Sequence, residues 1–218
     1  MDGQAAGPGD TWTWHAIFQR CPLRTLRDGE ALIVPGERPG RLFYLQSGNL
    51  RCSVVSVGGG VKTVFYARAG DFVGEALLFE ASNPVPLVVV SVGTPVVRSM
   101  GDSEVRRLIA SRPELAAELL VSLARKALEL AEQVRQLRFL PVEARVAAFL
   151  GRAVFRERPG GDGQDLRLTH DEIADYVGAH RVSVSEALGR MEGTGVIETG
   201  RGRIVVRDPE RLRRMATG

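Results

Sequence analysis

Hydrophobic and polar positions follow two different patterns before and after residue 102. Before it, short runs of valine, leucine, isoleucine and aromatic residues alternate with turn-forming pairs such as Ser47-Gly48. This pattern is typical of β-strands joined by tight turns, and many short strands predict a small barrel or sandwich. A short amphipathic helix is expected at residues 12–20. The expected strands span residues 31–34, 41–46, 49–57, 61–67 and 87–92.

A long helix is predicted after residue 102. From Pro113 to Leu137 there is no glycine and no internal proline, and apolar residues alternate spacings of three and four, as in a coiled-coil seam. The expected dimer interface consists of Leu120, Leu123, Ala127, Leu130, Val134 and Leu137. Leu119 and Leu128 form a second apolar flank, so we expect one face to cover the barrel and another to bind a second copy. The alternative is a helix that only lies on the barrel.

The segment that begins at Thr169 carries the signature of a helix-turn-helix. Thr169 and Glu172 form a capping box, which starts a helix. Ala174, Gly178 and Val184 then supply a small residue where two helices touch, a glycine for the turn and a branched residue that locks the second helix. Residues 195–206 predict two short strands around a glycine-rich turn, which is the wing of a winged helix.

The second helix of this motif is expected to read DNA, because a helix-turn-helix places the start of that helix in the major groove. Arg181 is expected to bind guanine O6 and N7, the alternative being a phosphate contact. Glu186 could accept a hydrogen bond from cytosine or pair with Arg190. The arginines of residues 200–214 could contact phosphates or form a solvated face. The expected DNA-binding residues are Thr169, His180, Arg181, Val182, Ser183, Ser185, Glu186, Arg190, Arg201 and Arg203.

Composition narrows the class of protein. The 218 residues are 44% hydrophobic, and no stretch is long and apolar enough for a membrane helix. The first residues do not form a secretory signal, so we expect a cytoplasmic protein. Cys21 and Cys52 lack metal or redox spacing; we expect reduced thiols, with a redox switch as the alternative. No nucleophile–base pair, metal cluster or phosphate loop is visible, so we expect no catalytic residues, no metal, no cofactor and no enzyme.

Three stretches together resemble the CRP/FNR family of transcription regulators: residues 70–75 (Gly-Asp-Phe-Val-Gly-Glu), residues 137–145 (Leu-Arg-Phe-Leu-Pro-Val-Glu-Ala-Arg) and the motif of residues 168–191. The resemblance covers nearly the whole chain. It implies an α+β fold with an N-terminal β-roll (a cyclic-nucleotide-binding-like jelly roll), a long dimerisation helix and a C-terminal winged helix-turn-helix. The corresponding domains are 1–101, 102–140 and 141–218.

The sequence departs from this family where its nucleotide-binding members hold cyclic AMP. Those members carry an Arg-Ser pair about ten residues after the Gly-Glu pair, where this chain has Val85 and Pro86. A phosphate there would lack a compensating cation. The expected effector pocket consists of Gly74, Glu75, Val85, Pro86, Leu130 and Ala131. Leu130 and Ala131 replace the hydroxyls that meet adenine, so we expect cyclic AMP not to be the effector. Glu75 is expected to hold a loop by hydrogen bonds.

Other effector types of the family also lack their residues here. The iron–sulfur branch needs four cysteines and this chain has two, and His15 is the only histidine before the DNA-binding domain, which is weak support for haem. The recognition helix departs too: many members begin it Arg-Glu-x-x-x-Arg, whereas Val182 and Glu186 replace the glutamate and second arginine, and Val182 would suit a thymine methyl.

The resulting hypothesis is a homodimeric regulator that binds double-stranded DNA at a pseudo-palindromic promoter site and contacts RNA polymerase, as an activator, independently of cyclic AMP. No membrane partner is expected, and the effector is unidentified. The alternative is a ligand-sensing module that acts through protein partners, with its winged helix as an interaction surface.

Overall fold

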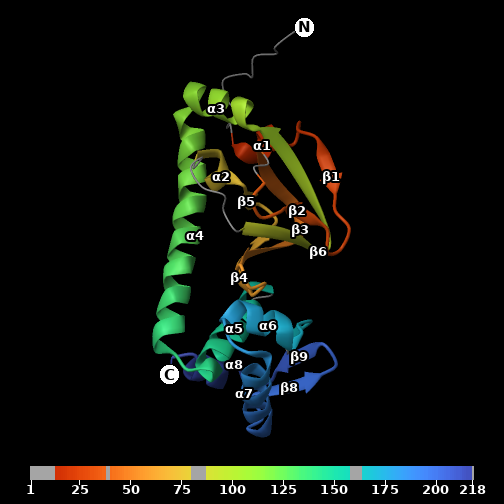
Figure 1. Ribbon diagram of the computed structural model, residues 1–218, viewed down its shortest axis with the longest axis vertical. Helices are drawn as coiled ribbons and strands as arrows, with labels where there is room; N and C mark the ends of the chain where they lie inside the picture. The colour runs from red at the N-terminus through yellow and green to blue at the C-terminus, as the bar shows by residue number, and fades with distance from the viewer. Residues whose placement is uncertain (1–12, 38–39, 80–86, 158–163, 218) are drawn as a thin grey trace. The chain divides into compact units, whose positions relative to one another are not determined.

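The computed structural model describes residues 13–37, 40–79, 87–157 and 164–217, without the side chains of residues 154–157 and 164–165 (Figure 1). Within these ranges no helix combines the length and apolarity needed to cross a bilayer.

The chain divides into two compact units, and each is described by itself. Unit 1 comprises Met1–Cys52 and Tyr66–Ala127, and unit 2 comprises Ser53–Phe65 and Leu128–Gly218. The long helix and one β-hairpin therefore contribute residues to both units. The domain boundaries expected from the sequence follow the order of the elements instead and stay a prediction.

Six strands form one sheet, as the alternation of apolar runs and turns predicts. The strands are β1 Leu23–Thr25, β2 Ala31–Ile33, β3 Arg41–Val55, β4 Val61–Arg68, β5 Phe72–Val73 and β6 Leu87–Gly101. Their order is β1-β6-β3-β4, with β2 paired to β6 and β5 to β3. The pairs of β6 with β1 and β2, and of β3 with β5, are antiparallel. The predicted β-roll is confirmed, and its strands 31–34 and 61–67 are found almost as expected.

The expected turn at Ser47-Gly48 is wrong, because the chain continues through it as one strand, β3. Gly48 has φ +81°, and a Cβ there would lie 2.7 Å from the Cα of Pro95. The glycine thus serves a close approach of two backbones rather than a reversal of the chain. The expected strand 87–92 is also longer than predicted, since β6 continues past Pro95 to Gly101.

An aromatic and aliphatic core fills unit 1. It joins the sheet to helices α1 (Trp14–Phe18), α2 (Glu75–Phe79), α3 (Asp102–Ser111) and α4 (Pro113–Phe139). The indole N–H of Trp14 donates a 2.8 Å hydrogen bond to the carbonyl oxygen of Leu115, so this buried polar group is satisfied. The core residues are Trp14, Phe18, Leu42, Tyr44, Phe72, Leu78, Met100, Val105, Leu115 and Leu119.

Unit 2 contains the predicted winged helix-turn-helix. Its helices are α5 (Val142–Glu157), α6 (His170–Val177), α7 (Arg181–Gly193) and α8 (Pro209–Met215). Its strands β7 (Gln164–Leu166), β8 (Ile197–Gly200) and β9 (Arg203–Val206) form an antiparallel sheet in the order β7-β9-β8. Gly202, with φ +65°, turns the chain between β8 and β9, which are the two expected wing strands.

Candidate nucleic-acid interface

The capping box at the start of α6 is formed as the sequence predicts. The hydroxyl of Thr169 accepts a hydrogen bond from the N–H of Glu172 at 3.2 Å. The Glu172 carboxylate accepts from the N–H of Thr169 at 2.8 Å. Two of the backbone donors that a helix start leaves unpaired are thereby satisfied, which fixes the first residue of α6.

The turn between α6 and α7 depends on a left-handed glycine and on an arginine from α5. Gly178 has φ 65° and ψ 53°, so it ends α6 in a conformation that favours glycine. Arg145 donates from Nη1 to the carbonyl oxygens of Val177 at 2.6 Å and Gly178 at 3.1 Å. A cation at the carboxyl end of a helix also complements its dipole. Arg145 was part of the family resemblance, but this role at the turn was missed.

The second helix presents a polar and an apolar side chain at its start. Arg181 and Val182 are exposed, Val182 to 68%, whereas Val184 and Leu188 are buried. Arg181 lies 3.5 Å from the Asp171 carboxylate, and both side chains are largely exposed. Such a surface ion pair contributes little free energy, so the guanidinium can leave it for a base at small cost.

Two other candidates on α7, Ser185 and Arg190, already have partners within unit 2. The Ser185 hydroxyl donates to the carbonyl oxygen of Arg181 at 3.0 Å and lies 2.8 Å from Nδ1 of His170. Arg190 donates to the carboxylate of Glu143 on α5 at 2.6 Å. The expected alternative pairing of Glu186 with Arg190 is therefore wrong, because α5 offers the arginine a carboxylate. Ser183 is half-buried, whereas His180 and Glu186 are exposed.

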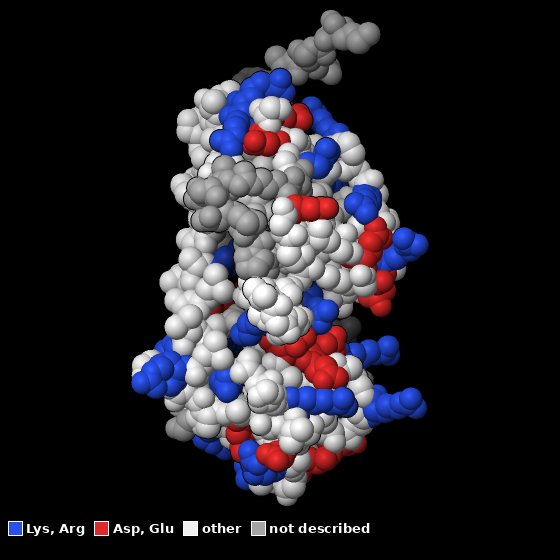
Figure 2. All heavy atoms as spheres, in the orientation of Figure 1, with Lys and Arg blue, Asp and Glu red and all other residues white. Residues whose placement is uncertain are grey.

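Three of the arginines of residues 200–214 form contacts within unit 2 that involve α8 or the wing. Arg207 pairs with Glu198, Arg213 with Glu210, and Arg211 donates to the carbonyl oxygen of Thr194. These three arginines therefore stabilise α8 and the wing, and we do not assign them to DNA binding. Arg201 and Arg203 are exposed beside the β8–β9 turn. On the face shown in Figure 2, acidic and basic side chains are interspersed, so the interface is assigned from individual residues rather than from a broad positive field.

The long helix α4 carries exposed apolar side chains. Leu120, Leu128 and Val134 are 64%, 73% and 66% exposed. Among the expected seam residues, Ala127, Leu130 and Leu137 are also exposed, and Leu123 is half-buried. The two residues of the second flank differ: Leu119 belongs to the core of unit 1, whereas Leu128 is exposed, as is Val121 about two turns earlier on α4.

Glu75, an expected effector residue, is buried against α4 in unit 1. Its side chain is 2% exposed and accepts hydrogen bonds from the Ser122 hydroxyl at 3.1 Å and from the Lys126 ammonium. Lys126 also donates to the carbonyl oxygen of Phe72 at 2.7 Å. The preceding Gly74, with φ +94°, approaches the carbonyl of Arg41 so closely that a Cβ would lie 2.9 Å from it. The negative charge of Glu75 is thus neutralised by Lys126 of the same chain.

Of the other effector candidates, only Leu130 and Ala131 lie within the described residues. Val85 and Pro86 lie outside the described residues. Leu130 and Ala131 follow Lys126 on α4 by about one turn and are exposed there.

A half-buried lysine in unit 2 was missed by sequence reasoning. Lys62, at the start of β4, donates from Nζ to Gln133 Oε1 at 2.6 Å, to Thr63 O at 2.7 Å and to the carbonyl oxygen of Tyr176 on α6. Burial lowers its pKa to about 8. A signal was present: Lys62 and Lys126 are the only lysines of the chain, and both reach buried acceptors. A slender ammonium stem can enter such places more easily than a planar guanidinium.

Comparison with known proteins identifies both halves of the chain. The Crp-like helix-turn-helix domain matches residues 144–215, and the cyclic nucleotide-binding domain matches residues 23–112. The CRP-like cAMP-activated global transcriptional regulator of Mycobacterium tuberculosis is 32% identical over 195 residues, which are 86% of this chain and 85% of that protein. The cAMP-activated global transcriptional regulator CRP of Pasteurella multocida is 29% identical over 192 residues, covering 87% and 92% of the two chains.

Solved structures have the same fold. A CRP/FNR-family transcriptional regulator from Thermus thermophilus matches with a TM-score of 0.77 and 23% identity over 90% of this chain and 99% of that one. The c-di-GMP-responsive global regulator CLP of Xanthomonas campestris matches with a TM-score of 0.77 and 21% identity, covering 88% and 97%. At these identities the structures support the fold alone.

Proposed function

Because the chain belongs to the CRP/FNR family of DNA-binding transcription regulators, we propose that it binds pseudo-palindromic promoter DNA as a homodimer and works without cyclic AMP. We further propose that the bound dimer contacts RNA polymerase and acts as an activator of transcription. The observation that carries DNA reading is the geometry of α6 and α7. A capped helix, a left-handed glycine and a second helix present Arg181 at its first residue.

Arg181 reads a base, and the wing contacts the backbone. The exposed guanidinium at the start of α7 fits the O6 and N7 acceptors of guanine, and its weak pairing with Asp171 leaves it available. Val182 lies beside it with an exposed apolar side chain suited to a thymine methyl. Arg201 and Arg203 supply phosphate contacts that position the domain without reading sequence.

A gel-shift or anisotropy assay with a promoter library tests this division. Arg181→Ala should cost about 1–3 kcal/mol on the preferred site and relax the preference at one G·C pair. Arg203→Ala should weaken binding to all sequences and reduce the salt dependence. If both variants lose affinity equally on every duplex, the assignment of base and phosphate roles is wrong.

The homodimer forms through α4. Leu120, Leu128 and Val134 would leave a large apolar surface in water on a single chain, and a second copy of the helix covers it. Two copies then present two α7 helices to half-sites about one helical turn apart.

Sedimentation of two matched variants tests the dimer. Val134→Arg should give monomers and lose affinity for the full site, because the interface would bury an unpaired charge. Val57→Arg, at a fully exposed valine of the β3–β4 turn, should stay dimeric. An equally tight dimer of the Val134 variant would place the interface elsewhere.

Independence from cyclic AMP is supported by the state of Glu75. Lys126 and Ser122 already use its carboxylate, and the sequence offers Val85 and Pro86 where a cation and a hydroxyl would meet the phosphate. Proline also lacks the N–H that could substitute. The purified protein should bind its site without additives, and calorimetry should detect no micromolar binding of cyclic AMP. Cyclic AMP that binds at micromolar concentration and raises DNA affinity would refute this part.

A further inference from the structure

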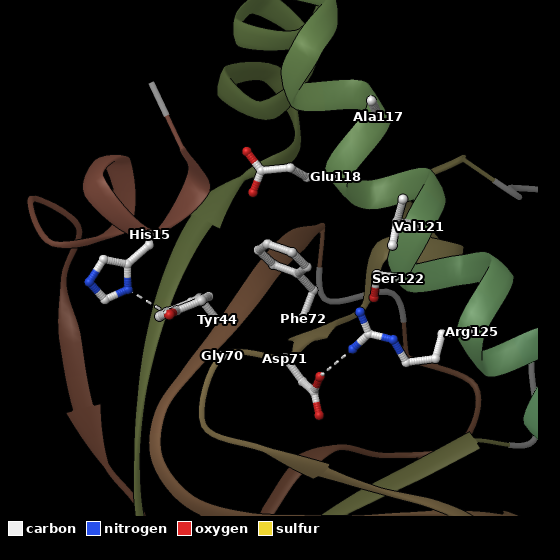
Figure 3. Close-up of a pocket in the computed structure, with 10 residues that line it drawn as sticks. All are labelled: His15, Tyr44, Gly70, Asp71, Phe72, Ala117, Glu118, Val121, Ser122 and Arg125. Carbon is white, nitrogen blue, oxygen red and sulfur yellow. Dashed lines mark hydrogen bonds and ion pairs between the residues drawn. The ribbon is translucent and has the colours of Figure 1, made fainter. Parts of the chain in front are cut away.

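Unit 1 contains a cavity whose lining includes Ser122, the residue that also donates a hydrogen bond to the Glu75 carboxylate, but not Glu75 itself. Its volume is about 400 Å³. It is bounded by α1, by β3, by residues 70–72 at the start of β5, and by one side of α4 (Figure 3). This volume lies in the range of small-molecule sites. No residue of the DNA-reading motif contributes to it.

The walls of the cavity are largely apolar. Tyr44 and Phe72 are buried aromatic residues of the core, and their rings lie 5.7 Å apart. From the opposite side α4 contributes Ala117 and Val121 (Figure 3). A flat apolar body would therefore find aromatic and aliphatic contacts on two sides of the cavity.

Most of the polar groups around this space are already matched. Nδ1 of His15 lies 2.7 Å from the hydroxyl of Tyr44. Arg125 lies 3.7 Å from the carboxylate of Asp71, which also accepts the N–H of Arg68 at 2.9 Å. These pairs, drawn in part in Figure 3, leave the basic and acidic groups on that side balanced.

Glu118 is the exception. It is half-buried, and burial raises the pKa of its carboxyl, with partial relief from the backbone N–H of Trp14. Among the residues that the structure describes, no lysine or arginine forms an ion pair with it. A half-buried carboxylate beside aromatic rings is the arrangement that attracts an organic cation, because an ammonium group restores the lost solvation of the charge.

We propose that this cavity binds a small organic cation with a flat apolar body, such as an arylalkylamine, whose ammonium group pairs with Glu118. The site is an effector site if the proposed regulatory function holds. A ligand there touches α4 at Ala117 and Val121, on the exposed side of the proposed dimer helix. It shifts DNA affinity only as far as it binds one arrangement of that helix better than another. Anions are disfavoured, since burial raises the pKa of Tyr44 and the negative charges of Asp71 and Glu118 raise it further.

Calorimetry with three probes of similar shape and different charge tests the site in the full-length protein. The probes are 2-phenylethylamine, 2-phenylethanol and 3-phenylpropionate. The amine should bind wild-type protein about tenfold or more tightly than the carboxylate. Glu118→Gln should weaken amine binding about tenfold and leave the alcohol unchanged. Glu114→Gln, at an exposed glutamate one turn earlier on α4 that does not line the cavity, is the matched control.

The outcomes separate this proposal from the proposed function. Equal binding of amine and carboxylate, equal binding of the amine to wild type and Glu118→Gln, or no binding of the amine at millimolar concentration would overturn the site. Retained alcohol binding and circular dichroism report that the variant is folded. DNA binding is measured in parallel without probes; its absence in wild type refutes the regulatory function and leaves the calorimetric result to stand by itself.

Discussion

The turn between α6 and α7 allows a stability prediction with opposite signs at two glycines of the same motif. Gly178 lies at the end of α6 with φ 65°, a conformation that L-residues adopt at a cost. In Gly178→Ala the new Cβ would also lie 2.8 Å from Cδ2 of Leu137. Leu137 is exposed, so its side chain can move aside and the backbone term dominates. Gly178→Ala should therefore destabilise unit 2 by about 1–2 kcal/mol.

Gly189 provides the matched control. It lies inside α7, and a Cβ there would meet nothing within 4 Å. A glycine in a helix interior is less favourable than alanine by about 0.5–1 kcal/mol, so Gly189→Ala should stabilise by this amount. The same chemical change then has opposite effects, and the two variants should differ by about 1.5–3 kcal/mol.

Urea denaturation followed by circular dichroism at one protein concentration measures both variants. Because each variant adds one methyl group, differences in hydrophobicity cancel between them. If Gly178→Ala is neutral or stabilising, the left-handed turn does not exist in solution and the helix-turn-helix geometry is wrong. If both variants lose stability equally, the loss has a cause other than backbone conformation.

Three further predictions concern buried ionisable groups. Lys126→Met should lower the free energy of unfolding by about 3–5 kcal/mol, because Glu75 would remain buried without its cation. Adding Glu75→Gln to this variant should restore part of the loss. If urea denaturation shows that the losses of the two single variants add in the double variant, the pairing is wrong. Burial lowers the pKa of Lys62 to about 8 from 10.5, so the unfolded chain binds more protons between these values and stability should rise across them. Lys62→Met should remove that rise, and an unchanged pH profile would refute it. Burial raises the pKa of the Cys21 thiol, and it raises the pKa of the Cys52 thiol to about 12. At pH 8 Ellman's reagent should therefore react slowly with Cys21 and reach Cys52 only on unfolding, and fast reaction of both thiols would disprove this prediction.

Local signals in the sequence were sufficient for the DNA-reading motif. Thr169, Glu172 and Gly178 act within a few residues of each other, so their spacing alone predicts the capped helix and its turn. The pairing of Arg190 with Glu143 could not be predicted in this way, because α5 and α7 meet only in the folded chain. The same limit explains Ser47-Gly48, where the need for glycine comes from Pro95 on a distant part of the sheet.

The candidate effector sites could be predicted only in part, for the same reason. Glu75 was found because it stands in a family motif, but its partner Lys126 is separated from it by 51 positions. Nothing local marks Lys126 as the cation that pairs with Glu75 except the scarcity of lysine in the chain. The cavity beside Glu118 could not be predicted, because His15, Tyr44 and Glu118 come from three distant segments.

Two glutamates near α4 explain why the proposed effector site differs from the nucleotide site of the family. Glu75 and Glu118 both lie in unit 1, and Lys126 supplies a cation to Glu75 alone. A ligand at Glu75 would have to break the ion pair between Glu75 and Lys126, which opposes binding. A cation at Glu118 displaces no charged group and removes an unfavourable burial of charge. Binding energy is thus available at Glu118 and not at Glu75, so a ligand of this protein should be a cation rather than a cyclic phosphate.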